Sequence, residues 1–372
     1  MKIGYDAKRL FFNTSGLGNY SRSLAGQMTA RYPDDEYTLF TPKLGNPCGF
    51  RVPEGVAVVG PDGFLSRKLP SLWRSYRMGG SIRRRGIELF HGLSNELPAD
   101  IRRSGARSVV TLHDIIFVHL PELYKAADRR LYTQKYKSSC FNADRVIAIS
   151  LRTKDDLVNL WNVPEEKIDV VYQGCNPVYY EPVPEEAKAA VRAKYGLPER
   201  YILSVGTIEE RKNLFLTVEA MALGKIDVDL VACGRPTPYL DKIRAFARKS
   251  GIEHRLHFFH DVTFAELPAF YQMAELLVYT SLYEGFGIPI LEAFESGIPV
   301  VTSRGGVFPE TGGDAAWYVD PHSAESMADA LRTILGDADT RAGMVRRGAA
   351  YALNFRDETV ARNIRAVYDK LR

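Results

Sequence analysis

The stretch that decides the fold is residues 284–301, which read EGFGIPILEAFESGIPVV. The apolar run LLVYTSLY before it and the run IPVVTS at its end each predict a buried strand. Between the two runs, residues 289–296 have helical spacing and begin with a proline, which suits a first helical turn. Gly285 and Gly287 precede this helix, and glycines let a ligand approach the backbone closely. The stretch therefore predicts a strand, a glycine turn and a helix whose amino end can bind an anion.

Two glutamates accompany the predicted helix. Glu284 stands just before it, and Glu292 lies about two turns further along. A carboxylate repels a phosphate, so both side chains are better explained as acceptors for sugar hydroxyls. The stretch thus indicates a pocket for a phosphorylated sugar or a nucleotide. The simpler explanation is an ordinary strand–turn–helix with two solvated glutamates, and the rest of the chain has to decide between them.

The Glu-x7-Glu spacing around GFG resembles the signature of the retaining family 4 glycosyltransferases. The resemblance covers essentially the whole chain. It implies an α/β protein of the GT-B fold, with two Rossmann-like domains facing across a cleft and a C-terminal helix packing back on the first domain. It also implies that Glu284 binds the transferred sugar, as one catalytic residue, and that Glu292 binds the ribose of the nucleotide.

Composition agrees with a two-domain protein. The 372 residues are 45% hydrophobic and 25% charged, as in ordinary globular proteins, and no apolar run reaches the about 18 residues of a membrane span. The start MKIGYDAKRL lacks the pattern of a signal peptide, and the four cysteines form no C-x-x-C pair. We therefore expect a cytoplasmic protein without disulfides or zinc. The net charge of +4 is too weak to indicate a nucleic-acid partner.

The basic residues are concentrated in one acid-free run, residues 64–86. The run holds seven cations: Arg67, Lys68, Arg74, Arg77, Arg83, Arg84 and Arg85. Apolar side chains interleave with them: Leu65, Leu69, Leu72, Trp73 and Tyr76. This pattern predicts a surface helix that contacts an anionic membrane or a phosphate-bearing acceptor. A solvated basic face over the core would give the same pattern.

Strand-like runs alternate with helical segments in both halves, which predicts two parallel sheets with flanking helices. In the first half these runs are residues 2–6, 36–40, 55–59, 88–92, 108–112, 146–150 and 168–172. In the second half they are residues 201–205, 227–236, 256–262, 276–283, 298–303 and 317–321. Three prolines (Pro177, Pro182 and Pro184) suit an inter-domain linker. We predict one domain from residues 1–176 with 355–372, and another from residues 177–354.

Two features of the first half are candidates for function. His113 follows the strand at residues 108–112, and ligands of open α/β sheets bind at such carboxyl ends. Gly16, Gly18 and Tyr20 form a G-x-G-x-Y sequence. A structural histidine and a simple turn explain these residues as well. The family resemblance implies that this histidine contacts the donor sugar, as a second catalytic candidate, and that the glycine loop faces the cleft or the acceptor.

Arg211 and Lys212 follow the glycine turn at Gly206 and Thr207. A planar guanidinium beside a compact ammonium suits a diphosphate. Cations at the start of a helix are electrostatically misplaced unless an anion is present, which argues against a merely solvated helix start. The segment also resembles the family's G-x-x-x-x-R-K-N loop, whose Arg and Lys bind the donor's diphosphate. With the resemblance, the candidate donor site comprises Gly206, Thr207, Arg211, Lys212, Glu284, Gly285, Phe286, Gly287, Ile288 and Glu292.

The sequence leaves the substrates partly open. The two cations and the helix start can replace a divalent metal at the leaving diphosphate, so we expect no metal and no other cofactor. The segments MKIGYDAKR, HGLSNELP, TLHD and VYQG resemble bacterial mannosyltransferases of surface polysaccharide assembly, which implies GDP-mannose as donor. A UDP-sugar is the runner-up, and the acceptor is expected to be a glycan or a lipid-linked glycan. The same pattern is compatible with an epimerase of the same fold or with a sugar-binding receptor.

Overall fold

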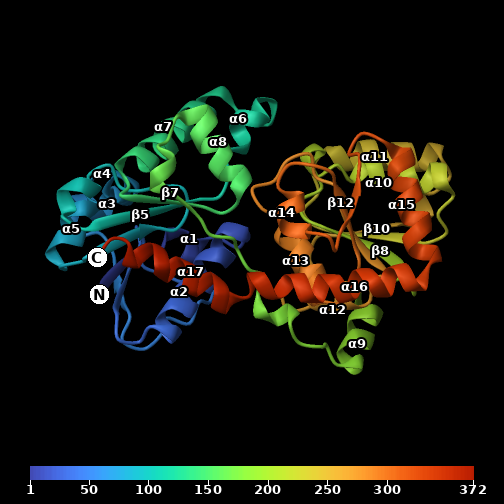
Figure 1. Cartoon of the computed structure of the whole chain (residues 1–372), viewed down its shortest axis with the longest axis horizontal. Helices are drawn as coiled ribbons and strands as arrows, with labels where there is room; N and C mark the ends of the chain where they lie inside the picture. Colours follow the sequence, from blue (N-terminus) through green and yellow to red (C-terminus); the bar gives the residue numbers. More distant parts are fainter. The chain divides into compact units, whose positions relative to one another are not determined.

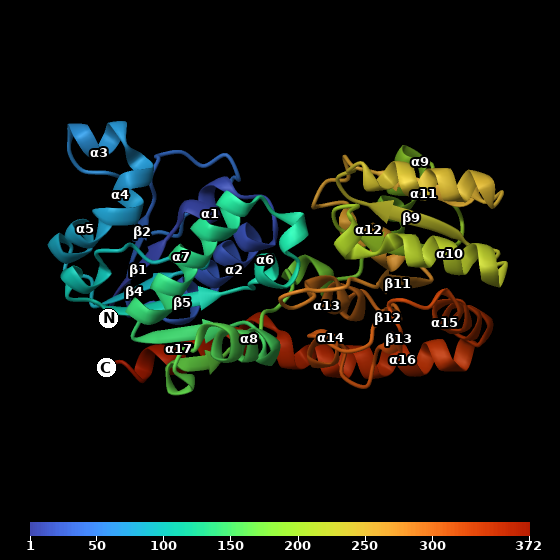
Figure 2. The ribbon, with the colours of Figure 1, turned by 90° about the horizontal axis from the view of Figure 1, so that it is seen from above.

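The computed structural model describes residues 1–372, apart from the side chain of Leu65, and divides into two compact units. Unit 1 comprises Met1–Gln173 together with Asp357–Arg372, and unit 2 comprises Gly174–Arg356. These boundaries lie two or three residues from those predicted, at residues 176 and 355. In both units helices cover the strands from either side (Figures 1 and 2).

Unit 1 contains a parallel sheet of seven strands in the order β3-β2-β1-β4-β5-β6-β7. The strands are β1 (Lys2–Asp6), β2 (Glu36–Phe40), β3 (Ala57–Val59), β4 (Leu89–Gly92), β5 (Arg107–Leu112), β6 (Arg145–Ala148) and β7 (Ile168–Val170). Ile3 of β1 pairs with Tyr37 on one side and with Leu89 on the other, so the chain changes direction across the sheet at β1. The predicted α/β architecture of this half is confirmed, with each strand where an apolar run predicted it.

The helices of unit 1 include one from the far end of the chain. They are α1 (Lys8–Phe12), α2 (Gly16–Arg31), α3 (Phe64–Lys68), α4 (Pro70–Tyr76), α5 (Met78–Arg84), α6 (Ile116–His119), α7 (Ala126–Asn142), α8 (Leu151–Trp161) and α17 (Asp357–Asp369), with short 3-10 turns η1 (Ile101–Ser104), η2 (Pro121–Leu123) and η3 (Glu165–Lys167). Helix α17 lies beside α2 (Figure 1), where Gln27 donates a hydrogen bond of 2.9 Å to Asp357. Ile364 of α17 belongs to the same buried cluster as Ile3. The predicted return of the C-terminal helix is confirmed.

Unit 2 repeats the architecture with six parallel strands in the order β10-β9-β8-β11-β12-β13. The strands are β8 (Tyr201–Val205), β9 (Asp229–Cys233), β10 (Leu256–Phe259), β11 (Leu276–Tyr279), β12 (Val300–Ser303) and β13 (Trp317–Val319). The helices are α9 (Glu185–Tyr195), α10 (Leu214–Gly224), α11 (Tyr239–Lys249), α12 (Leu267–Gln272), α13 (Ile288–Glu295), α14 (Phe308–Gly312), α15 (Ala324–Gly336) and α16 (Ala338–Ala352), with 3-10 turns η4 (Pro177–Tyr179), η5 (Glu210–Lys212), η6 (Glu253–Arg255) and η7 (Leu353–Phe355).

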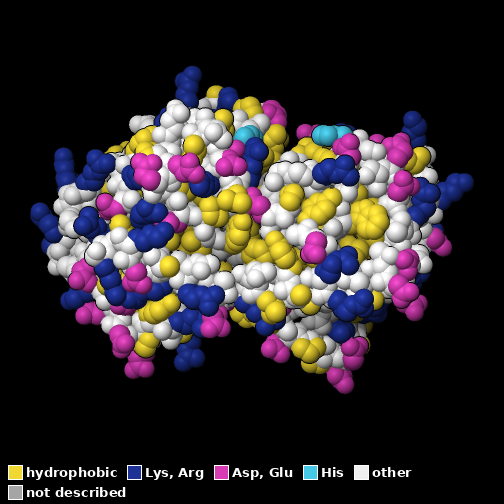
Figure 3. Space-filling model, in the orientation of Figure 1, with side chains coloured by type: hydrophobic (Ala, Val, Ile, Leu, Met, Phe, Trp, Pro, Cys, Tyr) yellow, Lys and Arg dark blue, Asp and Glu magenta, His cyan; other side chains and the backbone are white. Residues whose placement is uncertain are grey.

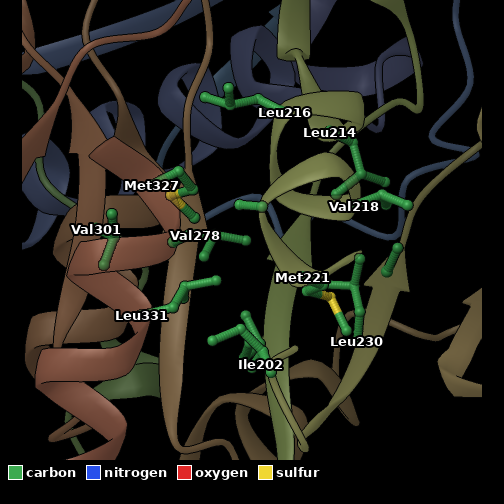
Figure 4. Close-up of a cluster of buried hydrophobic side chains, with 14 of the residues drawn as sticks. Ile202, Leu214, Leu216, Val218, Met221, Leu230, Val278, Val301, Met327 and Leu331 are labelled. Atoms are coloured by element: carbon green, nitrogen blue, oxygen red, sulfur yellow. The ribbon is translucent and has the colours of Figure 1, made fainter. Parts of the chain in front are cut away.

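The core of unit 2 forms where strands and helices meet. Figure 4 shows Ile202 of β8 and Val278 of β11 near Met221 of α10 and Leu331 of α15. All four side chains are almost completely buried. Burying apolar side chains of this size contributes about 1.5–3 kcal/mol each to the stability of the fold. The cluster therefore holds β8 and β11 in place, and with them the starting points of the loops that follow these strands.

The acid-free basic run, residues 64–86, differs from the single surface helix predicted. It folds as three short helices, α3, α4 and α5, and Trp73 is 2% exposed in their core. Arg74 is also buried, and its guanidinium lies 2.6 Å from Asp6 and 2.8 Å from Glu96. The burial of Arg74 has a physical reason, because two carboxylates from the carboxyl ends of β1 and β4 compensate its charge. The surface prediction is therefore wrong for Trp73 and Arg74.

The other six cations of the run, Arg67, Lys68, Arg77, Arg83, Arg84 and Arg85, are exposed. Figure 3 shows Lys and Arg side chains projecting from the edge of unit 1 where Figure 1 draws α3 to α5. Arg84 pairs with Asp62 at 2.7 Å, so part of its charge is neutralised. The predicted contribution of Leu65 falls on a side chain outside the described residues. Among the described residues, the helices are all too short or too polar to cross a bilayer.

Candidate functional site

Two loops of unit 2 meet at the carboxyl ends of neighbouring strands. The first leaves β8 through Gly206 and Thr207 and reaches Arg211 and Lys212 in η5. The second leaves β11 and reaches Glu284. The loops are joined by a backbone hydrogen bond of 2.8 Å from Leu282 N–H to the Arg211 carbonyl. Strands β8 and β11 are adjacent where the strand order reverses, which is the usual ligand position of an open α/β sheet.

The two cations of the first loop both contact the carboxylate of the second. The Arg211 Nη1 atom and the Lys212 Nζ atom each lie 2.7 Å from Glu284 Oε1. Arg211 also donates to the Tyr283 carbonyl at 2.8 Å, and its Nη2 atom pairs with Glu209 at 2.8 Å. The predicted diphosphate-binding pair and the predicted sugar-binding carboxylate thus form one cluster.

The cluster is largely buried, which strengthens the interactions between its charges. The side chains of Arg211, Lys212 and Glu284 are 13%, 18% and 11% exposed. Burial opposes ionisation of Glu284, but Lys212 and Arg211 outweigh it and lower the pKa of this carboxyl below its usual value. The same contacts raise the pKa of Lys212, despite its burial. All three groups are therefore charged at neutral pH.

Tyr279 also holds Lys212 in place. Lys212 Nζ donates to the Tyr279 hydroxyl at 2.9 Å and lies 4.7 Å from the centre of that ring. Burial raises the pKa of Tyr279 to about 12, so its hydroxyl stays protonated. Glu284 and Glu209 neutralise the two cations. An incoming diphosphate would compete with Glu284 for them.

The glycine turn before α13 forms as predicted. Gly287 is the residue before the helix and has φ +112°, a conformation that side-chain-bearing residues rarely adopt. Gly285 and Phe286 are buried in the turn, and the Phe286 carbonyl accepts a hydrogen bond of 2.7 Å from Thr311. Ile288 is the first residue of α13. This turn brings the amino end of α13 to the same sheet edge as the Arg211, Lys212 and Glu284 cluster.

Glu292 lies on α13 in a different environment. Its Oε2 atom accepts a hydrogen bond of 2.6 Å from the Tyr271 hydroxyl. The Tyr179 ring stands nearly perpendicular to the Tyr271 ring, with the ring centres 5.3 Å apart. Burial raises the pKa of Glu292 to about 7, although Tyr271, Tyr179 and Lys212 each oppose this rise. A carboxylate with such a pKa titrates in the physiological range.

The candidates of the first half gather in unit 1. Tyr20 is buried, its ring contacts the His113 ring edge-on at 4.7 Å, and its hydroxyl lies 3.1 Å from Thr111 Oγ1. Gly16 and Gly18 belong to the first turn of α2, rather than to a loop before it. A Cβ atom on Gly18 would lie 1.8 Å from the Asn13 carbonyl oxygen, so close packing explains this glycine. The structure brings Tyr20 and His113 together.

His113 is held as a neutral ring. One ring nitrogen, Nε2, lies 2.9 Å from the Leu93 carbonyl, which can only accept, so Nε2 carries the proton. The other, Nδ1, lies 2.7 Å from the side-chain amide of Gln173 and accepts from it. Burial lowers the pKa of His113 to about 4. Both nitrogens are occupied, so the contacts favour a positioning role for the ring over proton transfer, and its catalytic role stays a prediction.

Sequence reasoning missed several residues of these clusters. Tyr271 and Tyr179 lie beside Glu292, Tyr279 and Glu209 beside the cations, and Gln173 beside His113. Tyr271 and Tyr279 sit in apolar runs, where an aromatic residue is read as core. Gln173 directly follows the apolar run at residues 168–172, and a polar residue after a parallel strand was the available signal. Asn176, three residues on, caps η4 by accepting from Val178 N–H at 3.0 Å.

Two Asp-x-Asp tripeptides occur in the chain, and both lie away from these clusters. Asp229 begins β9 at its amino end and pairs with His257 at 2.8 Å, while Asp227 pairs with Arg255 at 2.5 Å. Asp337 caps α16, where it accepts from Asp339 N–H at 3.0 Å. These carboxylates have structural partners of their own, so they give no reason to place a metal at the sheet edge beside β8 and β11.

Two family models match the chain. "Glycosyltransferase Family 4" matches residues 14–178, and "Glycosyl transferases group 1" matches residues 187–351. Among curated proteins, O-antigen chain mannosyltransferase B of Escherichia coli is 28% identical over 375 residues, covering 95% of this chain and 96% of that protein. The O-antigen chain mannosyltransferase RfbU of Salmonella typhimurium is 30% identical over 235 residues, covering 62% of each chain.

Among solved structures, Anabaena HepE in complex with UDP and glucose is similar, with a TM-score of 0.78 and 19% identity. The match covers all of both chains. At this identity the likeness concerns the fold, and together with the two parallel sheets it supports a GT-B fold of two Rossmann-like units. The predicted fold is confirmed.

Proposed function

Because this chain belongs to the family 4 glycosyltransferases, we propose that it transfers a hexose from a nucleoside-diphosphate sugar with retention of anomeric configuration. The chain is an enzyme of the glycosyltransferase class, and two of its curated relatives are named O-antigen chain mannosyltransferases, while others are named D-inositol 3-phosphate glycosyltransferases. The acceptor is accordingly a glycan or a lipid-linked glycan of a surface polysaccharide. The observation that carries the proposal is the convergence of Arg211 and Lys212 on one carboxylate oxygen of Glu284, beside β8 and β11.

The cluster suits stabilisation of a leaving diphosphate. Breaking the bond between sugar and diphosphate leaves negative charge on the phosphate oxygens, and fixed cations stabilise that charge without reorganising. Arg211 supplies a planar fork and Lys212 a compact charge. Both are fixed before the donor arrives, because Glu284, Glu209 and Tyr279 hold them. When the diphosphate takes over the cations, the carboxylate of Glu284 is released to accept hydrogen bonds from the sugar.

The remaining donor contacts follow from α13. Backbone N–H groups at the amino end of this helix favour a phosphate oxygen, and Gly285 and Gly287 leave space for it. Glu292 accepts the ribose hydroxyls. The cations take the part that a divalent metal plays in other transferases, so no metal is required. His113 and Tyr20 form a rigid pair of rings within unit 1, and a contact of His113 with the sugar stays a prediction.

GDP-mannose is the proposed donor. The names of the two O-antigen chain mannosyltransferases described above support it. The UDP and glucose bound by the similar Anabaena protein make a UDP-sugar the second candidate. Isothermal calorimetry with GDP-mannose and with UDP-glucose, without acceptor, distinguishes them. Tighter binding of GDP-mannose is expected, tighter binding of UDP-glucose would reassign the donor, and binding of neither would contradict the proposal.

We further propose that unit 1 contacts an anionic membrane through the basic run. Leu69, Leu72 and Tyr76 are 47%, 51% and 61% exposed beside the cations. With Ser66, Trp73 and Arg77 they line an apolar hollow of about 250 Å³. Each cation near an anionic surface contributes about 1 kcal/mol, so the exposed cations can hold the unit on lipid in a salt-dependent way.

Vesicle co-sedimentation tests this contact. The parent should bind vesicles with anionic lipid, and not neutral ones, and should be released by high salt. The triple variant Arg67/Lys68/Arg77→Gln should lose binding. A control that removes the same charge from α11 in unit 2, Lys242/Arg244/Lys249→Gln, should retain it. Absence of binding at low salt would remove the membrane proposal and leave the donor proposal untouched.

A further inference from the structure

A buried hydroxyl near Glu292, that of Tyr179, has no evident structural role. The Tyr179 hydroxyl is completely buried, and within the described residues it makes no hydrogen bond of normal geometry. Leaving a buried hydroxyl without a partner costs about 1–3 kcal/mol, so such a group usually has a reason. Burial raises the pKa of Tyr179 most, and the nearby Glu292 carboxylate adds to this rise.

Tyr271 approaches the same carboxylate from another element. It lies on α12, is fully buried, and donates its hydroxyl hydrogen to Glu292 Oε2 at 2.6 Å. The edge-on contact with the Tyr179 ring restricts rotation of both rings. Glu292 therefore faces two phenols, one from η4 and one from α12, whose rings cannot turn away without disturbing each other.

This arrangement controls the ionisation of Glu292. The ionisable groups that face it are Tyr271 on α12, Tyr179 on η4 and Lys212 on η5. Burial raises the pKa of Glu292 to about 7, and each of these three groups lowers it. Only the ionised carboxylate can accept from Tyr271 and still offer its whole second oxygen to ribose hydroxyls, because the protonated form spends one oxygen as a donor.

We infer that Tyr271 and Tyr179 are positioning residues of the donor site: the Tyr271 hydroxyl holds the Glu292 carboxylate in the orientation that accepts ribose, and the Tyr179 ring keeps Tyr271 in place. The part of this inference that concerns ribose rests on the proposed donor function, whereas the contacts of Glu292 with the tyrosines do not. Tyr271 holds one oxygen and leaves the other for the nucleotide. Tyr179 supplies a second hydroxyl, which the ribose or Glu292 can engage when a nucleotide binds.

The first test needs no ligand. The titration midpoint of Glu292 is followed by the carboxyl 13C shift, assigned with Glu292→Gln. Tyr271→Phe keeps the ring and removes the hydroxyl, so the midpoint should move above the parent's value of about 7. Tyr179→Phe should move it in the same direction by less. Tyr201→Phe is the matched control, because this buried tyrosine donates to the Phe270 carbonyl at 2.7 Å in the same unit. An unchanged midpoint in Tyr271→Phe would overturn the inference whatever the protein binds.

The second test measures the affinity for GDP and for UDP from about pH 6 to about pH 9. Affinity of the parent should fall as the pH drops through the midpoint of Glu292. In Tyr271→Phe the fall should begin at higher pH, so the loss relative to the parent is several-fold larger near neutrality than at the alkaline end. A merely structural loss would lower affinity equally at every pH, and that result would contradict the positioning role. If the parent binds neither nucleotide, the proposed donor function fails, while the titration still judges the two tyrosines.

Discussion

Lys212 Nζ lies 2.7 Å from Glu284 Oε1, so the residue expected to hold the donor's diphosphate holds the residue expected to hold its sugar. Arg211 contacts the same oxygen at the same distance. The site is therefore charge-paired within the protein itself. Binding of the donor exchanges one anion for another at two cations that are already in place.

Replacing Lys212 with Ala should weaken donor binding. The change removes a charge-assisted hydrogen bond worth about 1.5–3 kcal/mol, or roughly 10- to 150-fold in Kd. Calorimetry with the nucleotide sugar measures it, and Arg211→Ala should behave alike. Lys242→Ala on α11 is the control, since this lysine is exposed. Parent-like affinity and turnover in both site variants would exclude the two cations from the donor site.

Replacing Glu284 with Gln should separate binding from turnover. Turnover should fall by about 10²-fold or more, because the amide cannot stabilise developing positive charge on the sugar. Affinity for the free nucleoside diphosphate should stay or increase, because the two cations lose their competing carboxylate. Steady-state kinetics and calorimetry give the two values. Weaker binding of the nucleoside diphosphate would show that Glu284 does not compete with it.

Activity should survive a chelator. Two cations at the leaving diphosphate make a divalent ion unnecessary. The initial rate with GDP-mannose and acceptor, measured after dialysis against EDTA, should equal that of the untreated enzyme. A loss that magnesium restores would show that a metal takes part in the reaction.

Replacing Arg74 with Ala should destabilise unit 1. Asp6 would remain as a buried carboxylate without its cation, and Glu96 would keep only Lys135 at 3.4 Å, at a cost of about 3–5 kcal/mol. Urea unfolding measures the change in the free energy of unfolding. Arg83→Ala at the exposed end of α5 is the control and should change it by no more than about 0.5 kcal/mol. An equal free energy of unfolding for the two variants would mean that the buried ion pairs do not stabilise unit 1.

The sequence predicted the strands well because fully buried strands are read directly from apolar runs. Residues 201–205 became β8 without a shift of either end. It also predicted the glycine turn at Gly287, whose backbone conformation excludes most other residues. Both features depend on local chemistry, which a single chain displays.

What the sequence could not show were contacts between distant residues. Arg74 looked like one more surface cation, because its partner Asp6 is 68 positions away. Tyr271 looked like core, because its bond to Glu292 depends on how α12 and α13 pack. The pairing of Lys212 with Glu284 joins two loops that are distant in the chain and that only the sheet brings together. In each case the side chain was visible and its partner was not.

Helix α17 has a consequence for how the protein is made. Ile364 and Val367 complete a buried cluster with Ile3 and Leu24, yet they are synthesised after the whole of unit 2. At roughly 5–20 residues per second the ribosome needs on the order of ten seconds or more to add the intervening residues. During that time residues 1–173 have an uncovered apolar face, whereas unit 2 is continuous and can fold as soon as it emerges. Unit 1 can therefore complete its core only after the whole chain has been made, although its first 173 residues are synthesised first.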